Sequence, residues 1–174
     1  MGLNIEIKAR CKNHKTIEEV MQKMNFPFEG SEVQTDTFFN VPHGRLKVRE
    51  YNNKTAVLIP YIRPDVKTPR ASDYVLLDIK EPNQTIDILE SMFGIRLVVE
   101  KNRKIYHYDN IRVHLDSIEE LGTFIELEGV VTKSDQREET LQKVELLMEL
   151  FEIKDNDIVL NAYVDLIEKM KLDK

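Results

Sequence analysis

The sequence predicts an α+β fold in which eight mostly meandering antiparallel strands close into a barrel, with helices packed outside. Charged and apolar residues alternate in segment after segment, as in Arg45–Arg49, so each strand has one apolar and one charged face. Short turn-forming stretches separate most of these segments, and closure removes exposed sheet edges. Two long amphipathic segments near the C-terminal end carry apolar stripes that need a sheet to cover.

The first half of the chain is expected to hold five strands and one helix. Asn13 can cap a helix over His14–Met24, in which Ile17 and Met21 recur on one face. Pro64–Arg70 contains two prolines and reads as a loop. The strands are expected at residues 3–11, 33–40, 45–51, 55–63 and 72–80.

The second half alternates strands with longer helices. Gly94 ends a helix that Pro82 opens, and Ser134 can cap an amphipathic helix. Residues 117–121 are expected to form a helical turn before Gly122. The strands are expected at residues 95–108, 111–116 and 123–131, and the helices at 84–93, 134–152 and 155–171.

Composition narrows the class of protein. A chain of 174 residues fits one domain over 1–174, and a net charge of −6 argues against non-specific nucleic-acid binding. Cys11 is the only cysteine, so no internal disulfide can form, as is typical of a reducing compartment. No apolar run reaches the roughly 20 residues that span a bilayer. We therefore expect a cytoplasmic protein without membrane or nucleic-acid partners; the oligomeric state, a homodimer included, stays open.

The charged strand faces suggest a polar, cation-rich cavity, if they point into the barrel. Such a cavity would suit a polyanion and its metal ions, whereas the alternative is a set of faces turned to solvent. Arg and Lys are the natural partners of phosphate oxygens. The cations on strand faces are Lys8, Arg10, Arg45, Lys47, Arg49, Arg63, Lys80, Lys101, Arg103 and Arg112.

Carboxylates on the same faces could hold a metal. Glu6, Glu126 and Glu128 lie on the polar faces of the first and last strands, which a closed barrel can bring together. Hard oxygen ligands suit Mg²⁺ or Mn²⁺, which also bind substrate phosphates. His107 and His114 are interpreted as hydrogen-bonding wall residues rather than general bases.

Several stretches, in order along nearly the whole chain, resemble the CYTH or triphosphate tunnel metalloenzyme superfamily. Ile5–Lys8 resembles its Glu-x-Glu-x-Lys strand, except that Asn4 stands where the family has its first Glu. Glu100–Arg103 resembles the strand of class IV, or CyaB-type, adenylyl cyclases. The run from Leu121 to Glu128 is the most similar of all.

The resemblance implies roles for individual residues. Metal binding would fall to Glu6, Glu126 and Glu128, and catalytic roles to Lys8, Arg103 and Asp116. The implied substrate-binding residues are Lys8, Arg45, Lys47, Arg49, Arg63, Lys80, Lys101 and Arg103. Arg112 joins this set because it is one of the cations on the strand faces.

Three alternative functions are compatible with this expected site. The first is a class IV-type adenylyl cyclase that converts ATP to cyclic AMP and pyrophosphate with Mg²⁺ or Mn²⁺. The second is a triphosphatase for an inorganic or organic triphosphate such as thiamine triphosphate. The third is a non-catalytic module that binds polyphosphate. Fold alone does not choose among them.

Overall fold

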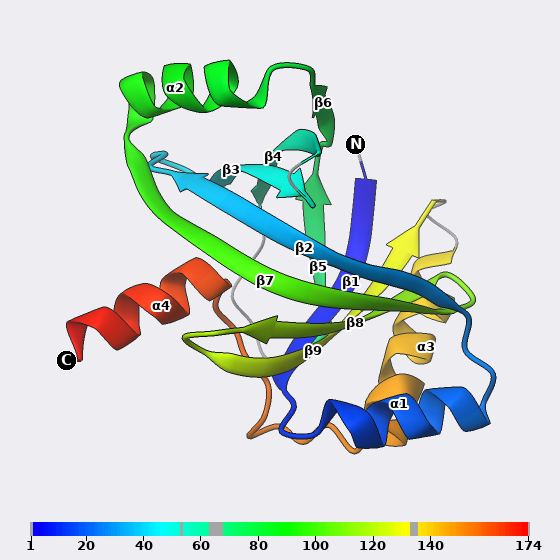
Figure 1. Ribbon diagram of the computed structural model, residues 1–174. Helices are drawn as coiled ribbons and strands as arrows, with labels where there is room; N and C mark the ends of the chain where they lie inside the picture. Colours follow the sequence, from blue (N-terminus) through cyan, green and yellow to red (C-terminus); the bar gives the residue numbers. More distant parts are fainter. Residues whose placement is uncertain (1, 53, 63–67, 133–135, 174) are drawn as a thin grey trace.

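The protein is described by a computed structural model that covers residues 2–52, 54–62, 68–132 and 136–173. Within these ranges the chain forms nine strands and four helices (Figure 1). The strands are β1 (Gly2–Arg10), β2 (Phe28–Phe39), β3 (Arg45–Tyr51), β4 (Thr55–Ile62), β5 (Arg70–Tyr74), β6 (Leu77–Ile79), β7 (Ile95–Tyr108), β8 (Ile111–Ile118) and β9 (Gly122–Val131). The helices are α1 (His14–Lys23), α2 (Pro82–Phe93), α3 (Arg137–Leu150) and α4 (Tyr163–Leu172).

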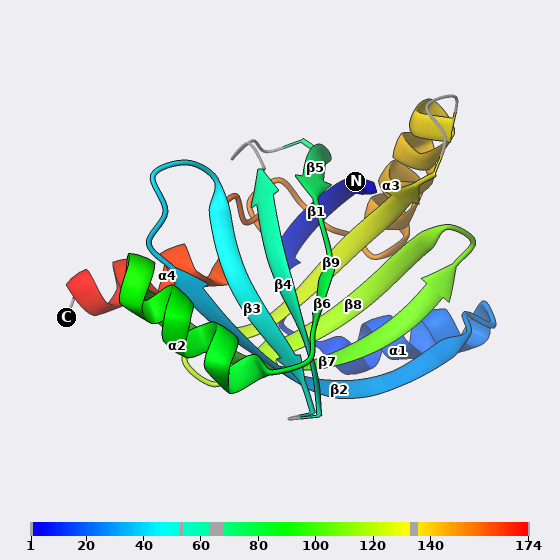
Figure 2. The same ribbon diagram turned by 90° about the horizontal axis from the view of Figure 1, so that it is seen from above.

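Eight strands close an antiparallel barrel, which confirms the predicted fold class. Their order is β3-β2-β7-β8-β9-β1-β5-β4, and pairing of β3 with β4 completes the ring. Figure 2 shows the curved wall from above, with the helices outside it. In this order β1 and β9 lie across the barrel from β2 and β3, so the inner faces of these two pairs look at each other.

The predicted single strand over 72–80 is wrong, because the chain makes two short strands there. β5 pairs with β1 along five positions, but with β4 only at Tyr61 and Ile62. β6 then pairs with a different part of β4, Ala56–Leu58. Polar and apolar residues alternate similarly in β5 and β6. The boundary between these two strands is therefore set by the strands with which they pair.

Other boundaries differ for comparable reasons. β2 begins at Phe28 rather than residue 33, because β7 pairs with it back to Tyr106. Strand pairing continues to Ile118, where a helical turn was expected. The last helix begins at Tyr163 rather than residue 155, and the stretch before it crosses β1 through a bridge between Ile158 and Ala9.

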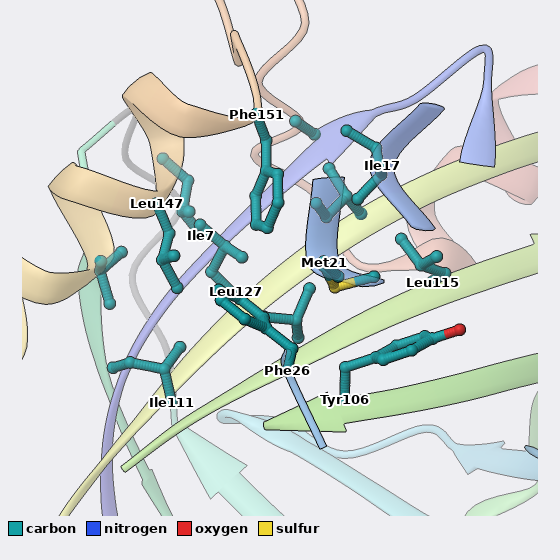
Figure 3. Close-up of a cluster of buried hydrophobic side chains, with 14 of the residues drawn as sticks. Ile7, Ile17, Met21, Phe26, Tyr106, Ile111, Leu115, Leu127, Leu147 and Phe151 are labelled. Carbon is teal, nitrogen blue, oxygen red and sulfur yellow. The ribbon is translucent and has the colours of Figure 1, made fainter. Parts of the chain in front are cut away.

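The apolar strand faces point outward under the helices. α1 and α3 cover β1, β8 and β9, where Ile7, Leu127, Met21 and Leu147 are at most 1% exposed (Figure 3). Each such side chain contributes about 1.5–3 kcal/mol when fully buried. α2 covers a smaller cluster over β2 and β3. Among the described helices, none is both long and apolar enough to cross a bilayer.

α4 closes one end of the barrel. Its first turn packs with Phe38 and Phe124 in a cluster that also contains Val164 and Ile167. The ring of Phe124 meets Tyr163 edge-on, with centroids 5.0 Å apart. Because the helices take up the apolar faces, the charged faces of the strands are left to line the interior.

Candidate functional site

A cavity of about 330 Å³ occupies the barrel interior. Its lining comes from the inner faces of all eight barrel strands and from the start of α4. Several charged side chains in the lining are almost fully buried, among them Lys8, Lys101 and Arg103 at 3–5% exposure. Buried charges are costly unless they are paired, so their presence marks a site rather than a packing core.

One wall of the cavity is basic and is formed by the neighbouring strands β3, β2 and β7. Lys47 and Arg49 lie on β3, and Asp36 of β2 accepts hydrogen bonds from both. The Lys47 Nζ lies 2.7 Å from Asp36 Oδ2, and Arg49 binds the carboxylate with two nitrogens at 2.6 and 2.7 Å. This paired geometry fixes the direction of both cations.

Asp116 of β8 likewise binds the cations of β7 and fixes their direction. Arg103 donates to it through Nε and Nη2, both at 2.6 Å, and the Tyr163 hydroxyl donates at 2.8 Å. Lys101 Nζ lies 3.5 Å away. Arg103 also reaches Glu126 of β9 at 2.7 Å, so its guanidinium links the basic wall to the carboxylates beyond.

The ionisation of these groups follows from burial and neighbouring charge. Burial opposes charge on Asp36 and Asp116, yet the adjacent cations outweigh it and hold the pKa of each carboxyl below its usual value. Burial and the charge of Arg103 lower the pKa of Lys101 to about 8. Burial, Asp116 and Glu126 raise the pKa of Tyr163 well above its usual value, so that hydroxyl stays protonated.

The facing wall, β1 with β9, carries carboxylates. Glu6 pairs in register with Glu128, and Glu126 pairs with Lys8. Burial raises the pKa of Glu126, but Lys8 and Arg103 outweigh that effect and hold it well below the usual range. Thus the sequence expectation that the first and last strands lie next to each other is confirmed.

Asn4 and Arg112 both bind the carboxylate of Glu128. The Asn4 amide nitrogen donates to Glu128 Oε1, and Arg112 Nη2 lies 2.9 Å from Glu128 Oε2. Asn4 is 2% exposed and accepts from the Tyr74 hydroxyl at 3.4 Å. The residue that departs from the family pattern therefore faces the cavity and touches a candidate metal ligand.

The carboxylates suit a hard divalent cation by chemistry and position. Glu6, Glu126 and Glu128 line the same cavity, and carboxylate oxygens are what Mg²⁺ and Mn²⁺ prefer. In the described part of the chain, no three acidic, histidine or cysteine side chains already converge into a metal cluster. A divalent cation held by one or two of these carboxylates would take its remaining ligands from a bound phosphate and from water.

His114 lies between two of these acids. Its Nδ1 is 3.9 Å from Glu126 and its Nε2 is 3.7 Å from Glu128, and Nδ1 has no hydrogen-bond partner. Burial and the charge of Arg103 lower the pKa of His114. His114 therefore lines the cavity as expected, but the predicted hydrogen bonding is not seen at Nδ1, and a neutral imidazole does not distinguish a wall residue from a general base.

The structure gathers most of the predicted residues but not all. Lys80 is exposed, and neither it nor Arg45 lines the cavity. Arg45 instead binds Asp165 of α4 at 2.9 Å. Arg63 lies outside the described residues. The predicted residues that line the cavity are Glu6, Lys8, Lys47, Arg49, Lys101, Arg103, Arg112, Glu126 and Glu128.

Two residues of the site were not singled out from the sequence for a role. Asp36 anchors Lys47 and Arg49, and Tyr163 joins Asp116 while its ring lies 3.8 Å from Lys8 Nζ. Asp36 shares the parity of Gln34 along β2, and a polar strand face is the signal for an inner-face position. Asp116 itself is fully buried behind the lining, which makes it a positioning residue for Arg103.

Comparison with known proteins agrees with this architecture. The model of the family described as the CYTH domain matches residues 2–163. The chain belongs to the CYTH domain family. Most of the lumen side chains described above, from Asn4 to Tyr163, fall within the CYTH match.

Relatives of this CYTH chain match nearly its whole length. A Methanocaldococcus jannaschii protein named "putative adenylate cyclase" is 22% identical over 174 residues, 94% of this chain and 98% of the relative. A solved structure from Pyrococcus furiosus has a TM-score of 0.82 at 23% identity, covering 94% of this chain and 99% of its own.

A second solved structure comes from Hippeastrum and is a "putative adenylyl cyclase" described as revealing a dominant triphosphatase activity. It has a TM-score of 0.66 at 14% identity, covering 98% of this chain and 96% of its own. At these identities the two structures show that the fold is shared.

Proposed function

We propose that this CYTH protein is a divalent-metal-dependent enzyme that acts on a triphosphate, with conversion of ATP to cyclic AMP and pyrophosphate as its reaction. One observation carries the proposal: one cavity in the barrel sets a wall of anchored cations against a wall of carboxylates. A triphosphate and its metal ion need these two kinds of surface at once.

The basic wall would bind the phosphate chain. Lys47, Arg49, Lys101 and Arg103 are held in place by Asp36 and Asp116 before any ligand arrives. Such preorganised donors lose little on binding, and they act in a site where water is scarce. Lys8, on the facing wall, would complete the set of cations around the phosphates.

The acidic wall would hold the metal through Glu6, Glu126 and Glu128. Mg²⁺ or Mn²⁺ bound there would neutralise phosphate charge as a Lewis acid. In the cyclase reaction the oxygen of the ribose 3′ hydroxyl would bond to the α phosphorus and lose its proton to solvent. The bond between the α phosphorus and the α–β bridging oxygen would break, and pyrophosphate would leave with that oxygen. Lys101 and Arg103 would stabilise the negative charge that moves onto that leaving group.

A second reaction is favoured by the Hippeastrum comparison. That protein is described as having a dominant triphosphatase activity, and the same two walls would serve attack by water on the terminal phosphorus of an inorganic or organic triphosphate. Asn4, in place of a carboxylate, motivates the third alternative, in which polyphosphate binds without turnover.

One assay separates these functions. The protein is incubated with ATP and either Mn²⁺ or Mg²⁺, and the phosphorus-containing products are resolved. Cyclic AMP with pyrophosphate supports the cyclase, whereas orthophosphate supports the triphosphatase. Absence of both, together with a higher melting temperature in the presence of triphosphate, leaves binding alone. Absence of any effect of triphosphate contradicts the whole proposal.

A further inference from the structure

The inner face of β2 runs from an exposed, acidic mouth to a buried, basic interior. Glu29 is exposed and Glu32 half-buried, whereas Gln34 and Asp36 are 2–3% exposed. All four line the cavity. Asp36 sits among the cations of the basic wall, while Glu29 and Glu32 put negative charge nearer to solvent. The inner face of β2 therefore changes in exposure along its length, while Glu32 and Gln34 lie in register with Arg103 and Lys101 of β7.

Gln34 stands where the two regions meet and has an unused acceptor. Its amide nitrogen donates to a Glu32 carboxylate oxygen, and its carbonyl oxygen has no hydrogen-bond partner. The ionised carboxylate accepts but cannot donate, so it fixes which end of the amide is nitrogen. A buried carbonyl without a donor is uncommon, because leaving it unpaired costs free energy that a ligand can recover.

We propose that Glu32 and Gln34 recognise an N–H donor on the organic group of a triphosphate ester. The inference rests on the proposed function, in which the basic wall holds the phosphates and leaves the rest of the ester toward the mouth. There, Glu32 and the Gln34 carbonyl would accept hydrogen bonds from an exocyclic amino group. Tyr51, in register with Gln34, and Tyr74 also line the cavity and offer rings on which a base can stack.

The same acceptors could instead attract a second divalent cation, since carboxylate and amide oxygens are hard ligands. Two features favour the N–H donor. Glu32 is already engaged by the Gln34 amide, which leaves one neutral acceptor beside it rather than a set of free carboxylates. The aromatic neighbours suit a planar organic group and contribute nothing to a metal ion.

The test compares two nucleotides whose hydrogen-bonding pattern differs at C6 and N1 of the purine ring. ATP carries an amino donor at C6 and an acceptor at N1, whereas ITP carries a carbonyl acceptor at C6 and an N–H at N1. ITP would therefore set an acceptor against Gln34 and Glu32 at the exocyclic position. Binding is measured by titration calorimetry in EDTA, where metal-dependent turnover cannot intervene, with inorganic tripolyphosphate as the reference. We expect ATP to bind about tenfold or more tightly than ITP.

Two substitutions test whether Glu32 and Gln34 cause the preference for ATP over ITP. Gln34→Leu and Glu32→Gln should bring the ATP-to-ITP affinity ratio toward one. Glu100→Gln, on the exposed outer face of β7, is the matched control and should keep the wild-type ratio. The wild-type ratio alone tests the inference if a variant fails to fold.

Each outcome either supports or contradicts recognition of an N–H donor by Glu32 and Gln34. Equal binding of ATP and ITP overturns the inference, and so does failure of both nucleotides to bind. A ratio that survives both substitutions also overturns it, above all if Glu32→Gln instead weakens the response to Mn²⁺. If the ratio behaves as expected but no turnover is found, the recognition by Glu32 and Gln34 stands and only the proposed catalysis fails.

Discussion

Replacing Asp116 by Asn should destabilise the barrel strongly. The carboxylate is fully buried and accepts from Arg103 twice and from Tyr163, with Lys101 3.5 Å away. Removing one member of a buried ion cluster typically costs about 3–5 kcal/mol, because the remaining charge stays buried. For a domain of this size, such a loss lowers the melting temperature by about 6–20 °C.

Thermal unfolding monitored by circular dichroism measures this effect. Asp87→Asn, at an exposed site on α2, is the control and should stay within about 2 °C of wild type. Tripolyphosphate should stabilise Asp116→Asn more than wild type, since the substitution adds one net positive charge to the cavity region. A melting temperature within about 2 °C of wild type would refute the view that Asp116 holds the basic wall together.

The same residue predicts a pH effect with a definite sign. Arg103 and Lys101 overcome the effect of burial and keep the pKa of Asp116 below its usual value of about 4. The stabilisation is therefore complete above that value and is lost as pH falls below it. Wild type should consequently lose more stability than Asp116→Asn between neutral pH and pH 3, as followed by urea unfolding at each pH.

Three further variants test the placement of the site. Glu126→Gln should abolish metal-dependent turnover, and unchanged product formation would remove Glu126 from the metal site. Asn4→Asp should lower the melting temperature without metal, because it faces Glu128, and should increase the stabilisation by Mn²⁺; a reduced Mn²⁺ response would count against metal binding on this wall. Lys80→Ala should leave the affinity for tripolyphosphate, measured by calorimetry, unchanged, whereas Arg49→Ala should weaken it at least about tenfold.

Alternation along the strands predicted most of the residues that face the cavity. A period of two is a local property, so Lys47 and Arg49 on β3, or Glu126 and Glu128 on β9, share a face wherever the strand is placed. Closure of the barrel followed from the need to cover so many strand edges. These inferences required no knowledge of which strands pair.

Features that depend on long-range pairing could not be predicted. The break between β5 and β6 is set by two separate parts of β4, and nothing local marks it. Lys80 follows β6, which pairs with β4 alone rather than joining the barrel wall, so a basic residue expected in the lumen is exposed. The contact of Tyr163 with Asp116 joins residues 47 positions apart and exists only because α4 folds back over the barrel end.

Triphosphate binding should depend on pH through Lys101. Burial and Arg103 lower the pKa of this amine to about 8, so in the free protein it is half protonated at that pH. A bound triphosphate favours the charged form and raises the pKa of Lys101, which means that binding at pH 8 takes up about half a proton. Above pH 8 the affinity should fall, by up to about tenfold for each pH unit, until the pKa of the bound state is reached.

ATP is a suitable ligand for this measurement, because phosphate groups lose their last proton near pH 6 and stay ionised across the range. Calorimetry at pH 8 in two buffers with different ionisation enthalpies gives the number of protons taken up. Lys101→Arg keeps the positive charge at all these pH values and should remove this part of the dependence. Affinity that is flat from pH 7 to 9.5 in wild type would mean that Lys101 does not meet the phosphates, and the basic wall would then have to bind them through Lys47, Arg49 and Arg103 alone.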